Sequence, residues 1–293
     1  MSKIGIGSAQ FGLNYGINSK KKINTLQIKK IFNYLYNNKK KCYIETAPVY
    51  GNAESLIGKN LKKKNQFKII TKTISSNGKK IDQQFIKKMN YNFLLSLKRL
   101  KQKKIYSIMV HDVNDLFKKN SNLLYDYLLN LKKKKLVKKI GVSVYNKKDI
   151  NKILLKYKFD IYQLPCNIFD QRLIYDGTLD KLKRKNIELH ARSIFLQGML
   201  FKKINEIPKN FISLKKKINL FHSRINYSKI TSQEAAISFV SNLKKFETLI
   251  IGFDNFEQFK NIIKNPIRKL HFKTTDLYCR DKKSMDPRRW KKI

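Results

Sequence analysis

Eight short runs of apolar and β-branched residues alternate along this chain with longer segments of helical periodicity. Runs of this length suit buried strands and are too short for helices. Eight strand–helix units in 293 residues predict a single-domain α/β fold, a (β/α)8 TIM barrel, because alternating elements of this kind build a parallel sheet covered by helices. A doubly wound sheet is the alternative, but its Gly-x-Gly-x-x-Gly phosphate loop is missing. The predicted strands are residues 3–8, 42–46, 67–72, 106–110, 139–143, 161–164, 187–191 and 248–251.

Capping residues and apolar stripes place the helices between these strands. Asn146 is a predicted N-cap, and Thr231 with Glu234 has the spacing of a capping box. One long interruption, between the seventh strand and its helix, predicts an extra helix over residues 211–224. The clearest stripe is formed by Phe85, Met89, Phe93, Leu97 and Leu100.

Composition indicates which classes of protein and which compartment the chain fits. Hydrophobic residues make up 42% of the chain, which excludes a disordered protein. Apolar stretches are too short for a membrane span, and the N-terminal residues lack the apolar core of a secretory signal. Three cysteines without a Cys-x-x-Cys pair predict a reducing cytoplasm and no metal site. No linker is evident, so we assign residues 1–264 to the barrel and 265–293 to a C-terminal extension packed on it.

The formal net charge is +45, which raises a polyanion-binding function as an alternative. Only nine of the 65 basic residues are Arg, the better reader of phosphates and bases. The lysines form small scattered clusters, such as 39–41, 132–135 and 215–217, and not one basic arm. We therefore interpret the charge as a solvated surface that attracts polyanions without specificity, and expect no specific nucleic-acid partner.

Four titratable side chains follow predicted strands at their C-terminal ends, where barrels of this kind place their chemistry. They are Glu45, Tyr50, Lys72 and His111. Taken singly, each has an ordinary structural role: a helix cap, a packed ring, a solvated cation or a hydrogen-bonded imidazole. Their convergence on one rim favours a catalytic site.

The sequence resembles the aldo/keto reductase superfamily, and its bacterial members in particular. The resemblance covers nearly the whole chain, with eight motifs in the family's order. It implies a (β/α)8 barrel that binds a nicotinamide cofactor without a Rossmann domain. The motifs are GSAQFGLNYGI, IETAPVYGNAESLIGKNL, FKIITK, SIMVHD, KKIGVSVYN, YQLPCNIFDQR, LHARSIFLQGML and LIIGFDNFEQF.

The resemblance implies a carbonyl reductase that takes hydride from NAD(P)H. Tyr50 is then the general acid, Lys72 lowers the cost of forming its anion, and His111 orients the carbonyl. Glu45 stands where the family usually has Asp. The carboxylate is kept, and we expect activity reduced to the extent that the added methylene displaces Lys72.

The resemblance also implies a cofactor pocket. Gly7 and Ser8 lie near the nicotinamide ribose, Ser143 and Gln163 bind the carboxamide, and Arg192 takes the place of the ring-stacking Tyr. Val144 replaces an Asn found in many members. The remaining implied cofactor contacts are Ser193, Phe195, Gln197, Gly252, Asp254 and Gln258.

The cofactor and the substrate are less sharply defined. NADPH is the family's usual partner and is our expectation. NADH is the alternative, because Asp254 stands where NADP-specific members tend to have a basic residue. A sugar or sugar derivative is the expected carbonyl substrate. The alternative function is a non-catalytic relative that binds cofactor and acts as an interaction subunit, which Glu45, Val144 and Arg192 motivate. The oligomeric state is left open.

Overall fold

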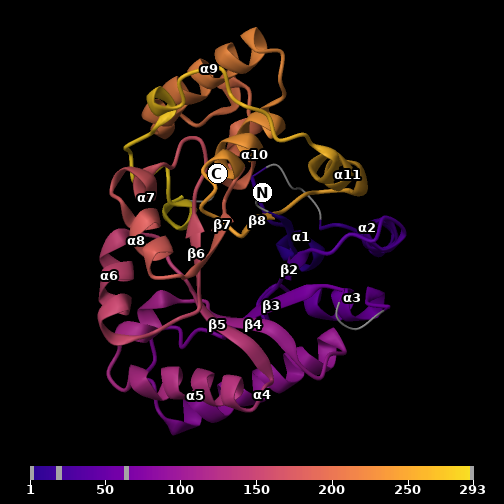
Figure 1. Cartoon of the computed structure of the whole chain (residues 1–293), viewed down its shortest axis with the longest axis vertical. Coiled ribbons are helices and arrows are strands. Elements are labelled where there is room, and N and C mark those ends of the chain that lie inside the picture. The colour runs from indigo at the N-terminus through magenta and orange to yellow at the C-terminus, as the bar shows by residue number, and fades with distance from the viewer. Residues whose placement is uncertain (1–2, 18–21, 63–65, 291–293) are drawn as a thin grey trace.

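Eight parallel strands close into a barrel in chain order, with β1 paired to both β2 and β8 (Figure 1). The computed structural model describes residues 3–17, 22–62 and 66–290, so a few residues of each predicted unit, 1–264 and 265–293, lie outside the described part. The predicted (β/α)8 barrel is confirmed, and each strand agrees with its predicted run to within two residues. The strands are β1 (Lys3–Gly7), β2 (Tyr43–Glu45), β3 (Lys68–Lys72), β4 (Ile105–Val110), β5 (Val137–Ser143), β6 (Ile161–Pro165), β7 (Glu188–Arg192) and β8 (Thr248–Ile251).

Helices follow the strands and cover the outside of the barrel. Short 3-10 helices occupy residues Val113–Phe117, Leu196–Phe201, Ile204–Glu206, Lys209–Phe211, Thr275–Leu277 and Pro287–Arg289. Among the described residues, no helix combines the length and the apolarity that crossing a membrane requires. The α-helices are α1 (Ala9–Gly12), α2 (Thr25–Asn37), α3 (Ala53–Asn60), α4 (Gln83–Leu100), α5 (Ser121–Lys133), α6 (Lys147–Lys156), α7 (Arg172–Tyr175), α8 (Thr178–Arg184), α9 (Ile212–Tyr227), α10 (Ser232–Asn242) and α11 (Phe256–Lys264).

The predicted caps form. The Asn146 side chain accepts from the Asp149 N–H at the start of α6, and Thr231 and Glu234 make the capping box of α10. These bonds satisfy backbone donors that the first turn of a helix leaves free. The predicted extra helix is α9, which ends three residues later than expected.

The strands divide their side chains between two surfaces, because successive residues point to opposite faces. Ile44 on β2 and Ile108 on β4 belong to the large apolar cluster under the helices. The other set fills the inside of the barrel with a separate cluster made of Tyr43, Ile70, Met109, Ile161 and Ile250. Inward residues at the C-terminal ends of the strands are therefore left to face a ligand.

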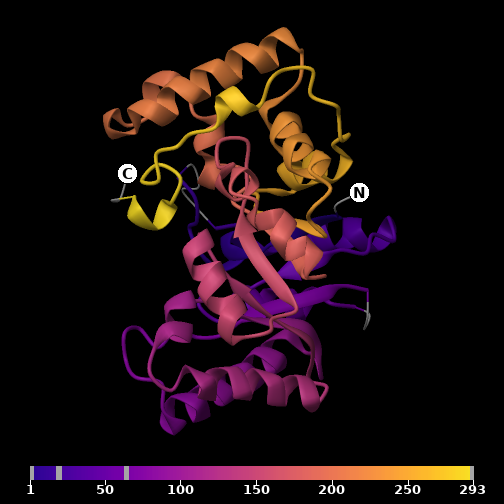
Figure 2. The same ribbon diagram turned by 60° about the vertical axis from the view of Figure 1, so that its left-hand side comes forward.

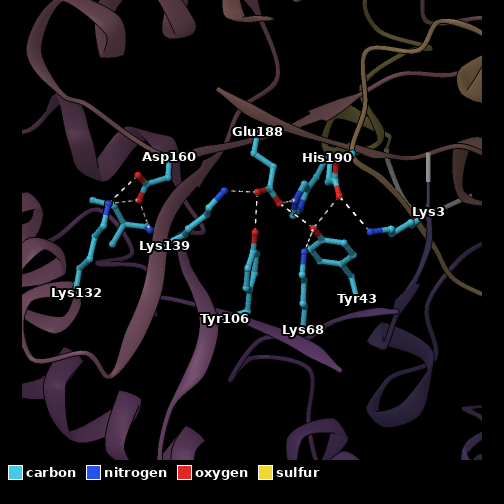
Figure 3. A network of polar contacts seen from close by, with 11 residues as sticks. Lys3, Tyr43, Lys68, Tyr106, Lys132, Lys139, Asp160, Glu188 and His190 are labelled. Atoms are coloured by element: carbon cyan, nitrogen blue, oxygen red, sulfur yellow. Dashed lines mark hydrogen bonds and ion pairs between the residues drawn. The ribbon is translucent and has the colours of Figure 1, made fainter. Parts of the chain in front are cut away.

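The N-terminal end of the barrel is closed by a polar network centred on Glu188, the first residue of β7 (Figure 3). Glu188 accepts hydrogen bonds from Tyr43 at 3.2 Å and from Tyr106 at 2.7 Å. His190 Nε2 lies 2.7 Å from Oε1 of the same Glu188 carboxylate, and Lys139 forms an ion pair with Oε2. The network seals the end of the barrel that faces away from the predicted site.

The C-terminal segment lies beside α9 at one end of the molecule (Figure 2). Arg224 of α9 pairs with Asp276 at 2.8 Å, and the ring of Phe211 meets that of Trp290 edge to face at 5.4 Å. The segment then returns toward the barrel, so that the 3-10 turn of Pro287–Arg289 brings Arg288 to the mouth of the cavity described next.

Candidate active site

A cavity of about 1070 Å³ opens at the C-terminal ends of the strands. Every strand supplies at least one residue to the wall of this cavity. In each case the residue lies within two positions of the C-terminal end of the strand. The sequence predicted a role for every one of these positions. They are Gly7, Glu45, Lys72, His111, Ser143, Gln163, Arg192 and Gly252.

The four predicted catalytic side chains meet in this cavity. Lys72 Nζ donates a hydrogen bond to Tyr50 Oη at 2.9 Å and forms an ion pair with Glu45. Tyr50 Oη also lies 3.5 Å from the Glu45 carboxylate. The ring of His111 stands edge-on to that of Tyr50, with centroids 6.1 Å apart. The Glu45 carboxylate thus contacts Lys72.

Burial governs the protonation of this cluster. It raises the pKa of Tyr50 above its usual value, with the Arg192 charge acting in the opposite direction, so the phenol is protonated at neutral pH. Burial and the Arg192 charge lower the pKa of Lys72, while the Glu45 carboxylate beside it favours the ammonium. Burial, Lys72 and Arg192 together lower the pKa of His111 to about 3. His111 is therefore a neutral hydrogen-bonding group, and Tyr50 keeps its hydroxyl proton at neutral pH.

Gly12, at the end of α1, fixes the position of the loop that carries Tyr50. A Cβ at Gly12 would lie within van der Waals overlap of the Tyr50 carbonyl, and one at Gly51 would lie 2.6 Å from the Gly12 carbonyl. Gly51 also has a φ of +56°, which side chains rarely adopt. The backbone of α1 therefore packs directly on the backbone of the Tyr50 turn.

We predict that Gly12→Ala moves Tyr50 away from Lys72. The added methyl cannot fit without shifting the loop, so kcat for carbonyl reduction is expected to fall by roughly tenfold or more, with a loss of stability of about 2 kcal/mol. Gly78→Ala is the matched control, because Gly78 has a φ of +86° and open space around it. Gly78→Ala is expected to lower the stability of the protein and to leave kcat unchanged. Equal kcat in wild type and Gly12→Ala would show that this contact does not position Tyr50.

Gln163 is the cavity residue whose polar atoms fit a carboxamide ligand. Its side chain is buried, and neither Oε1 nor Nε2 has a hydrogen-bond partner among the described residues. An unpaired buried amide is costly. A carboxamide ligand presents one donor and one acceptor and can satisfy both atoms. Gln163 pairs with Ser143 in the sheet register, and both line the cavity. The residues present thus fit the nicotinamide carboxamide.

The predicted phosphate and ribose contacts lie along the rim formed after β7 and β8. The backbone of Ser193, Leu196 and Gln197 has positive φ values of 60°, 46° and 54°, and such strain clusters at ligand sites. Asn255 caps α11 by accepting from the Gln258 N–H. The predicted cofactor residues on this rim are Ser193, Phe195, Gln197, Gly252, Asp254 and Gln258, all of which line the cavity.

Ser8 is the exception among the predicted cofactor residues. Its side chain is fully buried and does not line the cavity, and its N–H donates to the Glu45 carbonyl at 3.0 Å. Ser8 therefore sits behind the wall and not on it. Val144 lies in the outer apolar cluster, so its replacement of Asn changes a side chain that points away from the cavity.

Many cavity residues were not singled out from the sequence, among them Tyr145, Tyr15 and Arg288. Tyr145 follows β5 two residues after Ser143, and Tyr15 and Arg288 come from a loop and from the C-terminal segment. Tyr15 follows α1, and its hydroxyl accepts a hydrogen bond from Gln197 Nε2 at 3.3 Å. A strand-end position was a usable signal for Tyr145, whereas nothing local to Arg288 marks it.

Comparison with known proteins adds three findings. A family model described as the aldo/keto reductase family matches residues 3–274, and no curated protein matches the chain. The holo form of aldo-keto reductase AKR11C1 from Bacillus halodurans is similar in structure, with a TM-score of 0.72, 16% identity, and coverage of 94% of this chain and 92% of that one. Glycerol dehydrogenase AKR11B4 from Gluconobacter oxydans is similar with a TM-score of 0.68, 18% identity, and coverage of 94% and 90%. At these identities the two structures establish a shared fold.

Proposed function

The chain belongs to the aldo/keto reductase family, a family of NAD(P)H-dependent reductases of carbonyl compounds, and we propose that it reduces an aldehyde or ketone to an alcohol with Tyr50 as the proton donor. The observation that carries this proposal is the 2.9 Å contact between Lys72 Nζ and Tyr50 Oη, backed by the buried Glu45 carboxylate. A phenol alone is a poor acid at neutral pH, with a reference pKa of about 10. The adjacent ammonium stabilises the anion that forms when the proton leaves.

The side chains divide the reaction among them. A nicotinamide cofactor, when bound, supplies the hydride to the carbonyl carbon. Tyr50 Oη donates its proton to the carbonyl oxygen, and Lys72 donates a hydrogen bond to the phenolate that remains. His111, neutral because its pKa is about 3, can donate one N–H to the same oxygen and fix its direction. Glu45 holds Lys72 in place throughout.

We propose NADPH as the cofactor, with its carboxamide on Gln163 and Ser143. The unpaired buried amide of Gln163 supports the carboxamide contact. Asp254 on the rim argues for NADH, because a carboxylate repels a 2′-phosphate and accepts from a ribose hydroxyl. Titrating the intrinsic fluorescence with each cofactor decides the matter. A tenfold tighter dissociation constant for NADH would overturn this choice.

The function is tested by the oxidation of NADPH in a panel of aldehydes, followed at 340 nm. Sugar aldehydes and their derivatives are included, since a sugar-derived carbonyl is the proposed substrate. Turnover that requires both aldehyde and enzyme supports the reductase. Single-turnover mixing with the whole panel extends the test to slow reactions. Tight NADPH binding with no oxidation in any mixture would favour a non-catalytic, cofactor-binding subunit.

Glu45→Asp is expected to lower kcat by about tenfold, because a shorter side chain withdraws the carboxylate from Lys72 and a displacement of this size is costly in a catalytic cluster. Glu257→Asp is the matched control, since its side chain is 69% exposed on α11. It is expected to leave kcat unchanged. The opposite result, an inert wild type whose activity is recovered by Glu45→Asp, would show that this chain is not an active reductase as it stands.

We also propose a reducing, cytoplasmic setting. Cys42, Cys166 and Cys279 are all buried and free in the described part of the chain, and burial raises the pKa of each thiol. Buried thiols of this kind behave as small apolar side chains. They fit a compartment where disulfides are rare.

A further inference from the structure

Two loops at the mouth of the barrel leave neighbouring strands and stay in contact beyond the sheet. The β3 loop (residues 73–82) begins directly after Lys72, and the β4 loop (residues 111–120) begins with His111. β3 and β4 are parallel neighbours in the barrel, so both loops leave the sheet in the same direction. Both contribute to the cavity wall, with Ile74, Ser75 and Asn77 from the first and His111, Asp112, Val113 and Asn114 from the second.

Hydrogen bonds join the two loops at successive positions, in the same order along each loop. Every one of them uses a side chain of at least one partner, where the strands below use backbone groups alone. The parallel pairing of β3 and β4 is thus continued outward by side chains. In order outward from the sheet, the pairs are Thr73 with His111 at 3.2 Å, Ser75 with Asp112 at 3.1 Å, Ser76 with Asp115 at 3.0 Å, and Lys79 with Lys118 at 2.8 Å.

Asp115 is a buried carboxylate in this series, with a side chain that is only 1% exposed. It accepts hydrogen bonds from both the N–H and the hydroxyl of Ser76. Lys118 Nζ lies 3.4 Å from its carboxylate. A buried carboxylate is costly unless hydrogen bonds and a cation compensate it. Both are present here, and hydrogen bonds to a charged acceptor are stronger than those between neutral groups. Asp115 therefore fastens the β4 loop to the β3 loop.

The segment from His111 to Asp115 is held at both of its ends. At one end, the His111 N–H donates to the side chain of the residue that follows Lys72. At the other end, the Asp115 carboxylate is bound by the β3 loop. Between them, the Asp115 N–H donates to the Asp112 carbonyl at 3.1 Å and closes a turn of 3-10 helix. A short turn held at both ends has few alternative positions, so the place of His111 depends on both contacts.

We propose that Asp115 is a positioning residue, whose buried contact with Ser76 fixes the β4 loop on the β3 loop and thereby sets the position of His111 in the cavity. The proposal rests on the reductase function above, in which His111 directs the carbonyl oxygen. Asp115 lies behind the cavity wall and not on it, so it acts only through the residues that it holds. A small displacement of a positioned donor is costly in rate.

A double-mutant cycle separates positioning from general damage to the fold. Asp115→Asn is expected to lower kcat about tenfold, and the milder Ser76→Ala about threefold. The NADPH dissociation constant should stay within twofold of wild type, because the residues assigned to the cofactor lie on other strands. In a His111→Gln background, Asp115→Asn should change kcat less than twofold, since its target is already lost. A tenfold loss in both backgrounds would overturn the proposal.

Asp82→Ala is the control for lost stability. Asp82 is a carboxylate at the end of the same β3 loop, and its side chain is 31% exposed. It caps α4 by accepting from the Phe85 N–H at 2.8 Å. Loss of this cap should lower the urea midpoint of unfolding and leave kcat unchanged. A fall in kcat as large as that of Asp115→Asn would assign the effect to stability and refute the proposal.

Histidine labelled with ¹³C gives a readout that needs neither cofactor nor turnover. The chain has four His residues, and the signal of His111 is identified by its loss in His111→Gln. Wild type should show one narrow Cε1–H signal for His111. Asp115→Asn should show a broadened or divided signal, because the ring takes more than one position. An unchanged signal means that the proposal is wrong, whatever the activity. If the signal changes as expected but wild type reduces no aldehyde, the positioning stands and the reductase function fails.

Discussion

Tyr50→Phe is expected to lower kcat for carbonyl reduction by about a thousandfold, within the range of 10²–10⁴ that a positioned acid contributes. The substitution removes only the hydroxyl that accepts from Lys72 at 2.9 Å. The ring keeps its edge-to-face contact with His111, so the cavity retains its shape. Stopped-flow or steady-state oxidation of NADPH measures the loss.

The cofactor affinity separates this role from a structural one. NADPH binding to Tyr50→Phe, followed by fluorescence, should match wild type within twofold, because the phenol touches none of the residues assigned to the carboxamide. Tyr91→Phe is the matched control, with its side chain 63% exposed on α4. A kcat within tenfold of wild type in Tyr50→Phe would exclude Tyr50 as the proton donor.

Glu188→Gln is expected to lower the free energy of unfolding by about 3 kcal/mol, which is the usual cost of removing one partner from a buried ion pair. The Glu188 side chain is only 10% exposed, and it is the acceptor at the centre of the network in Figure 3. An amide there loses the charge that balances Lys139, and its NH₂ meets donors and not acceptors. Urea unfolding of wild type and variant measures the difference.

A partner at the rim of the same network provides the control. Glu247 is 43% exposed and pairs with Lys3 at 3.6 Å, so Glu247→Gln should cost less than about 1 kcal/mol. Activity per folded molecule should remain at the wild-type value in both variants, because this end of the barrel is remote from the cavity. Equal stability of wild type and Glu188→Gln would show that the network does not hold the barrel closed.

The pH dependence of this effect has a definite sign. Burial alone would raise the pKa of Glu188, but hydrogen bonds from His190, Lys139 and Tyr106 lower it below its usual value. A lowered carboxyl pKa stabilises the fold above the unfolded value, about 4.3, and the gain is lost as pH falls through the folded pKa. The difference between wild type and Glu188→Gln should therefore shrink in acid.

His190 works in the same direction over a higher range. Burial lowers its pKa in the folded chain, and Glu188 opposes this only in part. Below the unfolded value, about 6.5, the unfolded chain takes up the proton first, so stability falls as pH decreases. Wild type should thus begin to lose stability below about pH 6.5. A stability that is constant from pH 7 to pH 4 would contradict the assignment of His190.

The order of the elements and the place of the four candidate catalytic residues in one cavity were predictable from sequence, because they depend on local pattern. Short β-branched runs and a period of two place Glu45 and Lys72 inward at strand ends, and His111 follows β4 in the same alternation. In a closed parallel barrel all strand ends meet at one mouth. Residues far apart in the chain therefore had to converge there once eight strands were recognised.

Contacts between segments that are far apart in the chain could not be predicted from these local patterns. The fit of Gly12 against the Tyr50 carbonyl depends on how α1 packs on the next loop. The network around Glu188 of β7 depends on Tyr43 of β2, Tyr106 of β4 and Lys139 of β5 meeting at the N-terminal end of the barrel. Neither has a periodic signature in the chain, because the partners are set by strand register and barrel closure.

Arg192 illustrates the difference between what the sequence predicts and what the tertiary structure adds. Its place at the end of β7 followed from sequence, and its charge marked it as unusual for a ring-stacking position. Tertiary structure alone brings Arg192 and Arg288 onto the ring of Tyr145, and it pairs Arg288 with Asp286 while Arg192 meets no carboxylate in the described part of the chain. Sequence determined the barrel and the residues at its mouth, since both follow from local periodicity. The direction and the pairing of each charge were decided by long-range packing, because only the folded chain places the C-terminal segment against the end of β5.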